Sequence, residues 1–172
     1  MMRAMKIIVP VYLVIVAGCS GGGSAEVVHL TPAESQHKET WPIALDDPYV
    51  ISIANVCVQG GSEAVITSVE LVDAEGIEVV DFAVTPGVSY EAGSVADLDD
   101  IHAGHDKTIK AVCDGSSLEP TAVAAVNVQV RRTTVDRDST STAYKINWST
   151  AGRSGSFVSP LGLSLCNDCS VM

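Results

Sequence analysis

The chain has 172 residues, of which 47% are hydrophobic and 18% charged, with 10 basic side chains against 21 acidic ones. This length is typical of one domain of about 100–200 residues, which excludes large multi-domain catalytic architectures. The net charge of −11 argues against nucleic-acid binding, because that function requires clustered Lys and Arg side chains. We therefore expect one acidic domain with no nucleic-acid partner.

The first residues have the pattern of an export signal. Arg3 and Lys6 precede an apolar run of eleven residues, 7–17, which contains Pro10. A helix needs about 20 apolar residues to cross a bilayer, so this run matches the hydrophobic region of a secretory signal instead. Gly and Ser residues follow immediately, which disfavours a buried N-terminal helix of a cytoplasmic protein.

The apolar run ends in Val16-Ala17-Gly18-Cys19, which resembles the lipobox of bacterial lipoproteins. The resemblance implies removal of residues 1–18 and a diacylglyceryl group on the Cys19 thiol. Each buried methylene contributes about 0.8 kcal/mol, so two or more acyl chains hold a protein stably at a bilayer. We expect a protein on the cell membrane or outer membrane that faces outside the cytoplasm. The alternative is an ordinary signal peptide in which Cys19 is incidental.

Residues 19–40 are expected to form a lipidated flexible tether. Residues 20–24 are Gly and Ser only, a composition typical of flexible linkers. The polar stretch that follows contains Pro32 and shows no clear period. The predicted division is therefore a signal peptide at 1–18, the tether, and one folded domain at 41–172.

From residue 49 onward, short apolar runs alternate with Gly, Pro, Asp and Ser, which is typical of β-strands separated by turns. The runs expected to be strands are residues 49–58, 64–72, 77–84, 107–113, 121–131, 143–149, 156–158 and 161–165. Between the second and third runs, Gly76 can adopt the positive φ that a tight hairpin turn requires. Residues 95–102 are ambiguous between helix and loop.

Period-two alternation is clearest where three valines alternate with Asn127, Gln129 and Arg131. Such alternation places the apolar side chains on a core and the polar side chains in water, as in antiparallel sheets. Seven or eight short strands without a long helical segment predict an all-β fold, an antiparallel β-sandwich.

This region resembles the immunoglobulin-like domains of bacterial surface proteins. The residues that carry the resemblance are a strand containing Asn55 before a short Gly turn and the hairpin Val69-Glu70-Leu71-Val72…Gly76…Val79-Val80. The resemblance extends over residues 49–166 and implies an immunoglobulin-like sandwich of two sheets. In antibody domains of this fold a disulfide joins strands B and F.

Four cysteines remain after Cys19, namely Cys57, Cys113, Cys166 and Cys169. An even number in an exported chain favours disulfides, and four cysteines allow three pairings. We favour Cys57–Cys113 together with Cys166–Cys169, because the latter two are close in the sequence and the former two end predicted strands. The alternative is that Cys166 is joined to an earlier strand.

The spacing between Cys57 and Cys113 is compatible with the B–F bridge of the immunoglobulin resemblance. No Trp lies between them, and Ala111 stands where that family has a tyrosine, so the pattern departs from an antibody-type domain. Cys166-Asn167-Asp168-Cys169 also has the spacing of thioredoxin-like redox sites. That chemistry uses a helix N-terminus, and only three residues follow in this sequence, so we expect a structural bridge.

His102, His105 and Asp106 are the best candidates for a metal site. The acidic residues before them are Asp97, Asp99 and Asp100. Imidazole and carboxylate groups are good ligands for Zn²⁺ or Cu²⁺. We favour the alternative that this segment is a solvated acidic loop.

Motifs of enzymes are missing from the sequence, including the nucleophile elbow, the dinucleotide fingerprint and the P-loop. The aromatic content of 5% is too low for a platform that stacks sugars or bases. Arg131, Arg132 and Arg137 are interleaved with acidic residues, so we expect ion pairs at a strand end rather than a ligand site. No catalytic residue and no cofactor are predicted.

The sequence thus predicts a non-enzymatic binding or interaction module of the cell envelope, attached to the membrane through the lipid on Cys19, with an envelope protein as its partner. We expect the contact surface on loops or on an exposed sheet face, with residues 88–107 the first candidate because they form the longest irregular stretch. The alternative function is binding of zinc or copper by His102 and His105.

Overall fold

The computed structural model describes residues 25–30, 38–87, 94–101, 106–113, 123–167 and 169. These residues form twelve strands and one short helix. In chain order the elements are β1 (Glu26–His29), β2 (Lys38–Pro42), β3 (Tyr49–Gln59), β4 (Ala64–Val72), β5 (Ile77–Pro86), β6 (Ser94–Val95), α1 (Leu98–Ile101), β7 (Thr108–Ile109), β8 (Ala124–Arg132), β9 (Ser139–Ser141), β10 (Ala143–Ser149), β11 (Ser154–Ser159) and β12 (Gly162–Cys166).

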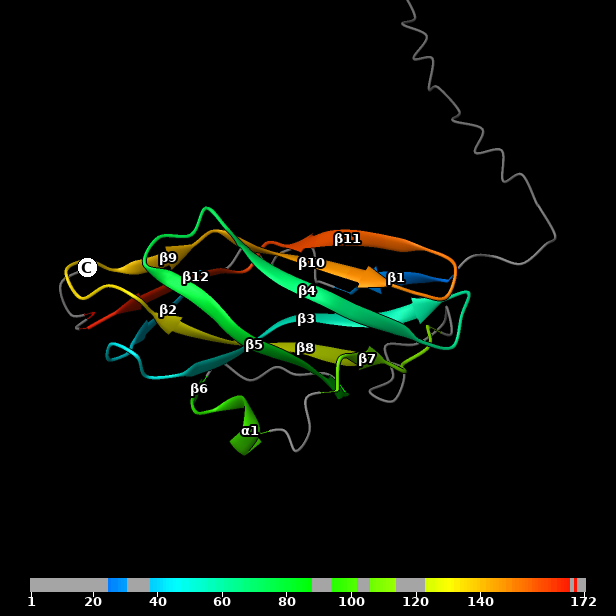
Figure 1. Ribbon diagram of the computed structural model, residues 1–172, viewed down its shortest axis with the longest axis horizontal. Coiled ribbons are helices and arrows are strands. Elements are labelled where there is room, and N and C mark those ends of the chain that lie inside the picture. Colours follow the sequence, from blue (N-terminus) through cyan, green and yellow to red (C-terminus); the bar gives the residue numbers. More distant parts are fainter. Residues whose placement is uncertain are drawn as a thin grey trace, which may run out of the picture.

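Two antiparallel sheets pack face to face, and a smaller third sheet lies at one end of them (Figure 1). One main sheet has the strand order β1-β3-β8-β5, with β6 paired to β3, and the other has the order β11-β10-β4-β7. The third sheet, β2-β12-β9, contains one parallel pair, β2 with β12. The all-β sandwich expected from the sequence is therefore confirmed.

The order of the long strands is that of a constant-type immunoglobulin domain. We assign the letters A to G in chain order to the seven long strands, so that A is β1, B is β3, C is β4, D is β5, E is β8, F is β10 and G is β11. The two sheets then have the orders A-B-E-D and G-F-C. Strand β7 extends the second sheet beyond strand C. The number of strands exceeds the predicted seven or eight, because β1, β2, β6 and β9 were not foreseen.

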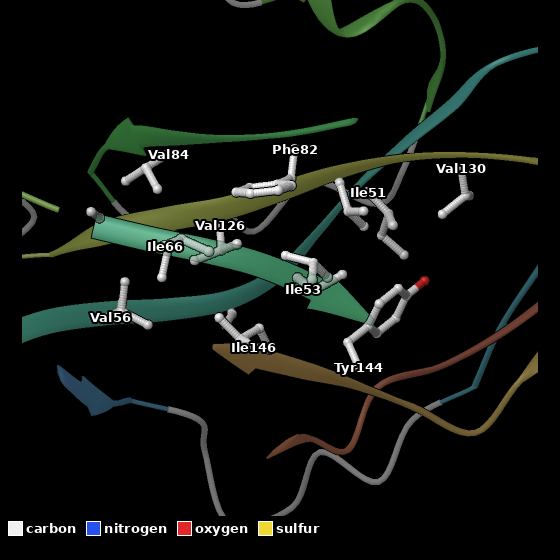
Figure 2. Packing of buried hydrophobic residues seen from close by; sticks show 14 of the residues in the cluster. Ile51, Ile53, Val56, Ile66, Phe82, Val84, Val126, Val130, Tyr144 and Ile146 are labelled. Carbon is white, nitrogen blue, oxygen red and sulfur yellow. The ribbon is translucent and has the colours of Figure 1, made fainter. Parts of the chain in front are cut away.

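The core lies between the two main sheets. Figure 2 shows Ile53 of β3, Phe82 of β5 and Val126 of β8 pointing toward Ile66 of β4 and Ile146 of β10. All five side chains are buried in the same cluster. Each such side chain contributes about 1.5–3 kcal/mol when it is removed from water, so this contact holds the two sheets together.

The turn between β4 and β5 has the positive-φ glycine that the sequence predicts, but the predicted hairpin is wrong, because β4 and β5 belong to different sheets and do not pair with each other. Gly76 has a φ of 63° and Asp73 a φ of 48°, both in the left-handed region that glycine adopts without a steric penalty and that aspartate tolerates. Glu75 exchanges backbone hydrogen bonds of 2.8 and 2.9 Å with Thr140. The turn therefore carries the chain from one main sheet to the other and fastens it to β9.

The predicted boundary at residue 41 is wrong. Strand β1 pairs with β3 and β2 pairs with β12, so both strands belong to the folded domain although they begin within the expected tether at 19–40. Strand β1 buries Val27 alone among its four side chains, and none of the β2 side chains is fully buried. Because these short strands bury so little surface, their sequences do not alternate between apolar and polar residues, and they were not predicted.

Candidate functional site

The outer surface of the sheet β11-β10-β4-β7 is an exposed sheet face, which we call the open face. It is formed by outward-pointing side chains of the three long strands, which are exposed or half-buried. These are Val65, Thr67, Ser68, Glu70, Lys145, Asn147, Ser149, Ser154, Ser156 and Val158. Val65 and Val158 lie at opposite corners and are 41% and 53% exposed. Hydroxyl and amide groups fill the area between them.

A hydrogen-bond network orders the centre of the open face. The Asn147 amide donates to Ser68 Oγ at 2.8 Å and to Glu70 Oε1 at 2.7 Å. The Lys145 ammonium lies 3.7 Å from Glu70 Oε2. Because the one cation and the one carboxylate of the face are paired, the open face carries no net charge in a chain whose net charge is −11.

A groove with a volume of about 420 Å³ adjoins the Val158 corner of the open face. Its lining consists of residues from β2, β9, β10, β11, β12 and the connections between them, namely Lys38, Thr140, Ser141, Thr142, Ala143, Val158, Pro160 and Gly162. Val158 belongs to both surfaces. The open face thus continues into a concave, mainly apolar region, the kind of surface that can receive a side chain of a partner.

The outer surface of the other main sheet is covered around β8. Leu98 of α1 is 1% exposed and packs with Val50 and Ala83, and Figure 1 shows α1 on the opposite side of the sandwich from β10 and β11. The Leu98 N–H donates to Gln129 Oε1 at 2.8 Å. Asn127 donates to Thr85 Oγ1 at 2.9 Å.

This cover overturns one expectation. Asn127 and Gln129 were predicted to point into water, and they are only 5% and 6% exposed. Their hydrogen bonds satisfy the buried amides, as buried polar groups require. Arg131, the third residue of that alternating set, is exposed and pairs with Glu78 at 2.5 Å.

The candidate metal ligands are only partly within the described residues. His102 and His105 lie outside them. The Asp106 carboxylate accepts the Thr108 N–H at 2.8 Å and lies 3.1 Å from the Lys110 ammonium. These contacts, the Thr108 bond above all, lower the pKa of Asp106. Within the described residues, no three or more His, Cys, Asp and Glu side chains are grouped so that they could hold a metal ion.

The residues of the predicted anchor also lie outside the described part of the chain. This applies to Cys19 and to the whole of residues 1–24. It also applies to residues 88–93 and 102–105, which are half of the stretch expected to provide the contact surface. Among the described residues, no helix combines the length and the apolar character needed to cross a bilayer.

The two disulfides are those that the sequence favours. The Cα atoms are 5.3 Å apart in Cys57–Cys113 and 5.7 Å apart in Cys166–Cys169, within the usual range for bridged cysteines. Cys113 does not lie on strand F, however, so the comparison with the B–F bridge is wrong. It follows β7, between strands D and E, and the bridge fastens this segment to β3.

Arg132 is the buried group that the sequence analysis missed. Arg137 pairs with Glu75 at 3.2 Å, as expected of a charged turn, whereas Arg132 is 1% exposed and donates to uncharged oxygens. A signal was present in the sequence. Position 132 has the same parity as Val126, Val128 and Val130, so the alternation of β8 directs its side chain inward.

Two phenols are enclosed at the same end of the core. Tyr49 and Tyr144 have no exposed surface, and burial raises the pKa of both side chains well above the ordinary value for tyrosine. Both hydroxyls therefore stay protonated at neutral pH. Because they are enclosed between the sheets, they pack the core and do not meet a substrate.

Neither a scan against protein-family models nor a search of curated proteins gives a match for this chain. Function is therefore inferred from the sequence motifs and from the geometry of the described residues. The arrangement that this geometry favours is a sandwich with one exposed, hydrogen-bonding face that carries no net charge.

Proposed function

We propose that this protein is a lipid-anchored, non-enzymatic interaction module of the bacterial cell envelope, which binds a protein partner through the open face. The observation that supports it best is the difference between the two sheets, one covered around β8 and the other exposed across three strands. The lipid on Cys19 would hold the module at the membrane with its partner.

The anchor is supported by the lipobox at residues 16–19 and by the compartment that the disulfides require. Disulfides persist in oxidising environments outside the cytoplasm, and this domain contains two. Both features support a location outside the cytoplasm.

The choice of a protein partner follows from the chemistry of the open face. Its hydroxyl and amide groups can make hydrogen bonds, and Val65 and Val158 supply apolar contact at its corners. Protein interfaces combine an apolar contact with about one hydrogen bond per 100–200 Å². Because the open face carries no net charge, a partner meets little of the repulsion that the rest of this acidic chain exerts on anionic surfaces.

The anchor is tested by labelling cells with an alkyne-bearing fatty acid and separating membranes from soluble material. We expect label on the processed protein and recovery in the membrane fraction. Cys19→Ala should abolish both, whereas the neighbouring control Ser20→Ala should retain both. An unlabelled and uncleaved wild-type chain would overturn this part of the proposal.

The open face is tested with a photo-crosslinking amino acid placed at Thr67 or Ser156 in living cells. Val135, which is 52% exposed in the β8–β9 turn, provides the control position. We expect one discrete adduct from both open-face positions and none from the control. Asn147→Arg should suppress that adduct by placing a charge at the centre of the face. Equal adducts from all positions, or none from the open face, would refute the assignment.

A further inference from the structure

Arg132, the last residue of β8, carries a buried positive charge where the two main sheets meet the third sheet. Arginine has five N–H donors, and each has an acceptor here. Nε donates to Ser139 Oγ at 3.4 Å. Nη1 donates to Ile43 O at 2.9 Å and to Asn167 Oδ1. Nη2 donates to the carbonyl oxygens of Thr134 and Arg137, both at 3.1 Å. All five are uncharged oxygens, so the cost of burying the guanidinium is offset by hydrogen bonds alone.

These acceptors connect three separate segments of the chain. Ile43 follows β2 and is itself held to β12, because its N–H donates to Cys166 O at 2.8 Å. Thr134, Arg137 and Ser139 belong to the β8–β9 turn and the start of β9. Asn167 comes from the chain after β12. Arg132 therefore joins the end of strand E to both edges and the centre of the third sheet.

Asn167 accepts from Arg132 through a side chain that lies in the chain after the last strand. It is exposed, and its amide makes one long contact of 3.5 Å with Val135 O. The disulfide Cys166–Cys169 closes a four-residue loop around it. The covalent bridge is thus what restricts Asn167 to the position from which it accepts from Arg132.

The two sulfurs of this bridge differ in accessibility. Cys166 is 1% exposed, whereas Cys169 is half-buried, so a thiol from solution reaches the Cys169 sulfur more easily. Cys166 Sγ lies 3.5 Å from Trp41 O, an acceptor for the thiol hydrogen that reduction would create. After reduction, β12 would stay in place and Asn167 would be released.

We propose that the Cys166–Cys169 disulfide is a redox-sensitive restraint that holds Asn167 over the buried guanidinium of Arg132. Reduction by a dithiol releases this restraint and loosens the β8–β9 turn. A thiolate of the dithiol attacks the Cys169 sulfur, the S–S bond breaks, and Cys166 leaves as a thiolate that takes up a proton. The second thiol of the reductant then displaces Cys169, so that two electrons pass to the protein and the reductant becomes a disulfide.

The other disulfide provides an internal comparison. On both sides of Cys57–Cys113, backbone hydrogen bonds join Val58 to Ala111 at 2.8 Å and to Cys113 at 2.9 Å. Breaking that bridge would leave these bonds in place. The Cys166–Cys169 loop has no such ladder within the described residues, and the consequence of opening it should therefore be local and detectable.

The test uses the full chain in detergent micelles with increasing dithiothreitol. Differential alkylation and mass spectrometry report the state of each bridge, and hydrogen–deuterium exchange reports the amides of residues 133–138. Both bridges join a buried to a half-buried cysteine, and they differ in the backbone hydrogen bonds beside Cys57–Cys113. We therefore expect Cys166–Cys169 to open at a reductant concentration about tenfold below that needed for Cys57–Cys113. Amide exchange in the turn should then rise about tenfold, since one hydrogen bond to a buried charge is lost.

Variants distinguish this restraint from a general loss of stability. Cys169→Ser and Asn167→Ala should each raise exchange at residues 133–138, and the double variant should raise it no further, because both changes remove the same contact. Asn147→Ala, the same substitution on the open face, is the matched control and should leave the turn unchanged. Additive effects, no effect of Asn167→Ala, or earlier opening of Cys57–Cys113 would each overturn the proposal. None of these outcomes depends on whether the open face binds a partner.

Discussion

The outer faces of the two main sheets differ although their central strands have the same alternating pattern. On β10, Lys145 and Asn147 point outward and remain half-exposed on the open face. On β8, Asn127 and Gln129 also point away from the core between the sheets, yet both are buried. Leu98 of α1, a residue 31 positions away in the sequence, packs on the strands on both sides of β8 and donates to Gln129. Asn127 donates to Thr85 of the neighbouring strand β5.

The comparison shows that alternation identifies the two sides of a strand but not their environments. One side of β8 packs in the core between the two main sheets. On the other side, Gln129 accepts a buried hydrogen bond from the Leu98 N–H of α1. A polar residue on the second side is tolerated because it has a partner there. Four substitutions test this difference between the two faces, and they follow in order of decreasing expected effect.

Leu98→Ala should have the largest effect. The Leu98 side chain is 1% exposed and packs on Val50 and Ala83, so its truncation removes buried apolar contact and leaves a cavity. We expect the free energy of unfolding to fall by about 2–3 kcal/mol, measured by chemical denaturation. Val158→Ala on the open face, where the side chain is 53% exposed, should change it by less than about 0.5 kcal/mol. If both variants lost a similar free energy of unfolding, the Leu98 side chain would be packed no more closely than Val158 on the open face.

Gln129→Met should have the next largest effect. Methionine has a similar length but cannot replace Oε1 as the acceptor of the buried Leu98 N–H. An unsatisfied buried donor costs about 1–3 kcal/mol, which denaturation would report. Asn147→Leu also removes two hydrogen bonds, but on the open face water replaces them, and the expected change is below about 0.5 kcal/mol. A loss at Asn147 as large as that at Gln129 would contradict the assignment of the two environments.

Gly155→Ala tests how closely β11 lies on the core beneath the open face. A Cβ at this position would come within 2.5 Å of Trp148 Cζ2 and 2.9 Å of Cε2, and Trp148 is only 4% exposed. The buried Trp148 ring cannot move away without disturbing its neighbours. Such overpacking lowers the free energy of unfolding by about 1–3 kcal/mol. Gly152→Ala, in the turn before β11, would meet no atom within 4 Å and is the matched control. Equal melting temperatures for the two variants would indicate that β11 is loosely packed.

Long, well-alternating strands were predictable from the sequence. The predicted strands at 64–72 and 143–149 have the same bounds as β4 and β10, because each buries alternate side chains and ends at turn residues. The edge strands β1 and β2 were not predictable, since pairing to a neighbour, rather than their own side chains, makes them strands. The open face follows from the alternation of β10, whereas the cover over β8 depends on contacts distant in the sequence.

The cysteines show a similar limit. Their pairing followed from the even count and the short spacing of Cys166 and Cys169, but spacing alone could not show on which strand Cys113 lies. The chain between β5 and β8 contains β6, α1 and β7, so the 56-residue separation ends before strand F is reached. Arg132 was missed for another reason. A charged residue was assigned to the surface by its type, although its parity in β8 places it inside.

The smallest expected effect concerns the seam where β1 of the covered sheet meets β11 of the open one. The His29 ring stacks on the Phe157 ring, and the two ring centroids are 4.7 Å apart. Burial of the imidazole lowers the pKa of His29 from the ordinary value of 6.5. As the pH falls below 6.5, His29 takes up a proton in the unfolded chain before it does so in the folded protein. The free energy of unfolding therefore decreases with falling pH in this range. At higher pH, His29 is neutral in both states and its titration does not change the stability. The measurement is the free energy of unfolding of wild type minus that of His29→Gln, from urea unfolding at several pH values.

The contributions of the other histidines cancel in this difference, because both proteins share them. We expect the difference to be constant above about pH 7.5 and to change below pH 6.5. A difference independent of pH would mean that His29 is as hydrated in the folded protein as in the unfolded one, and that the seam between the two faces is open to water.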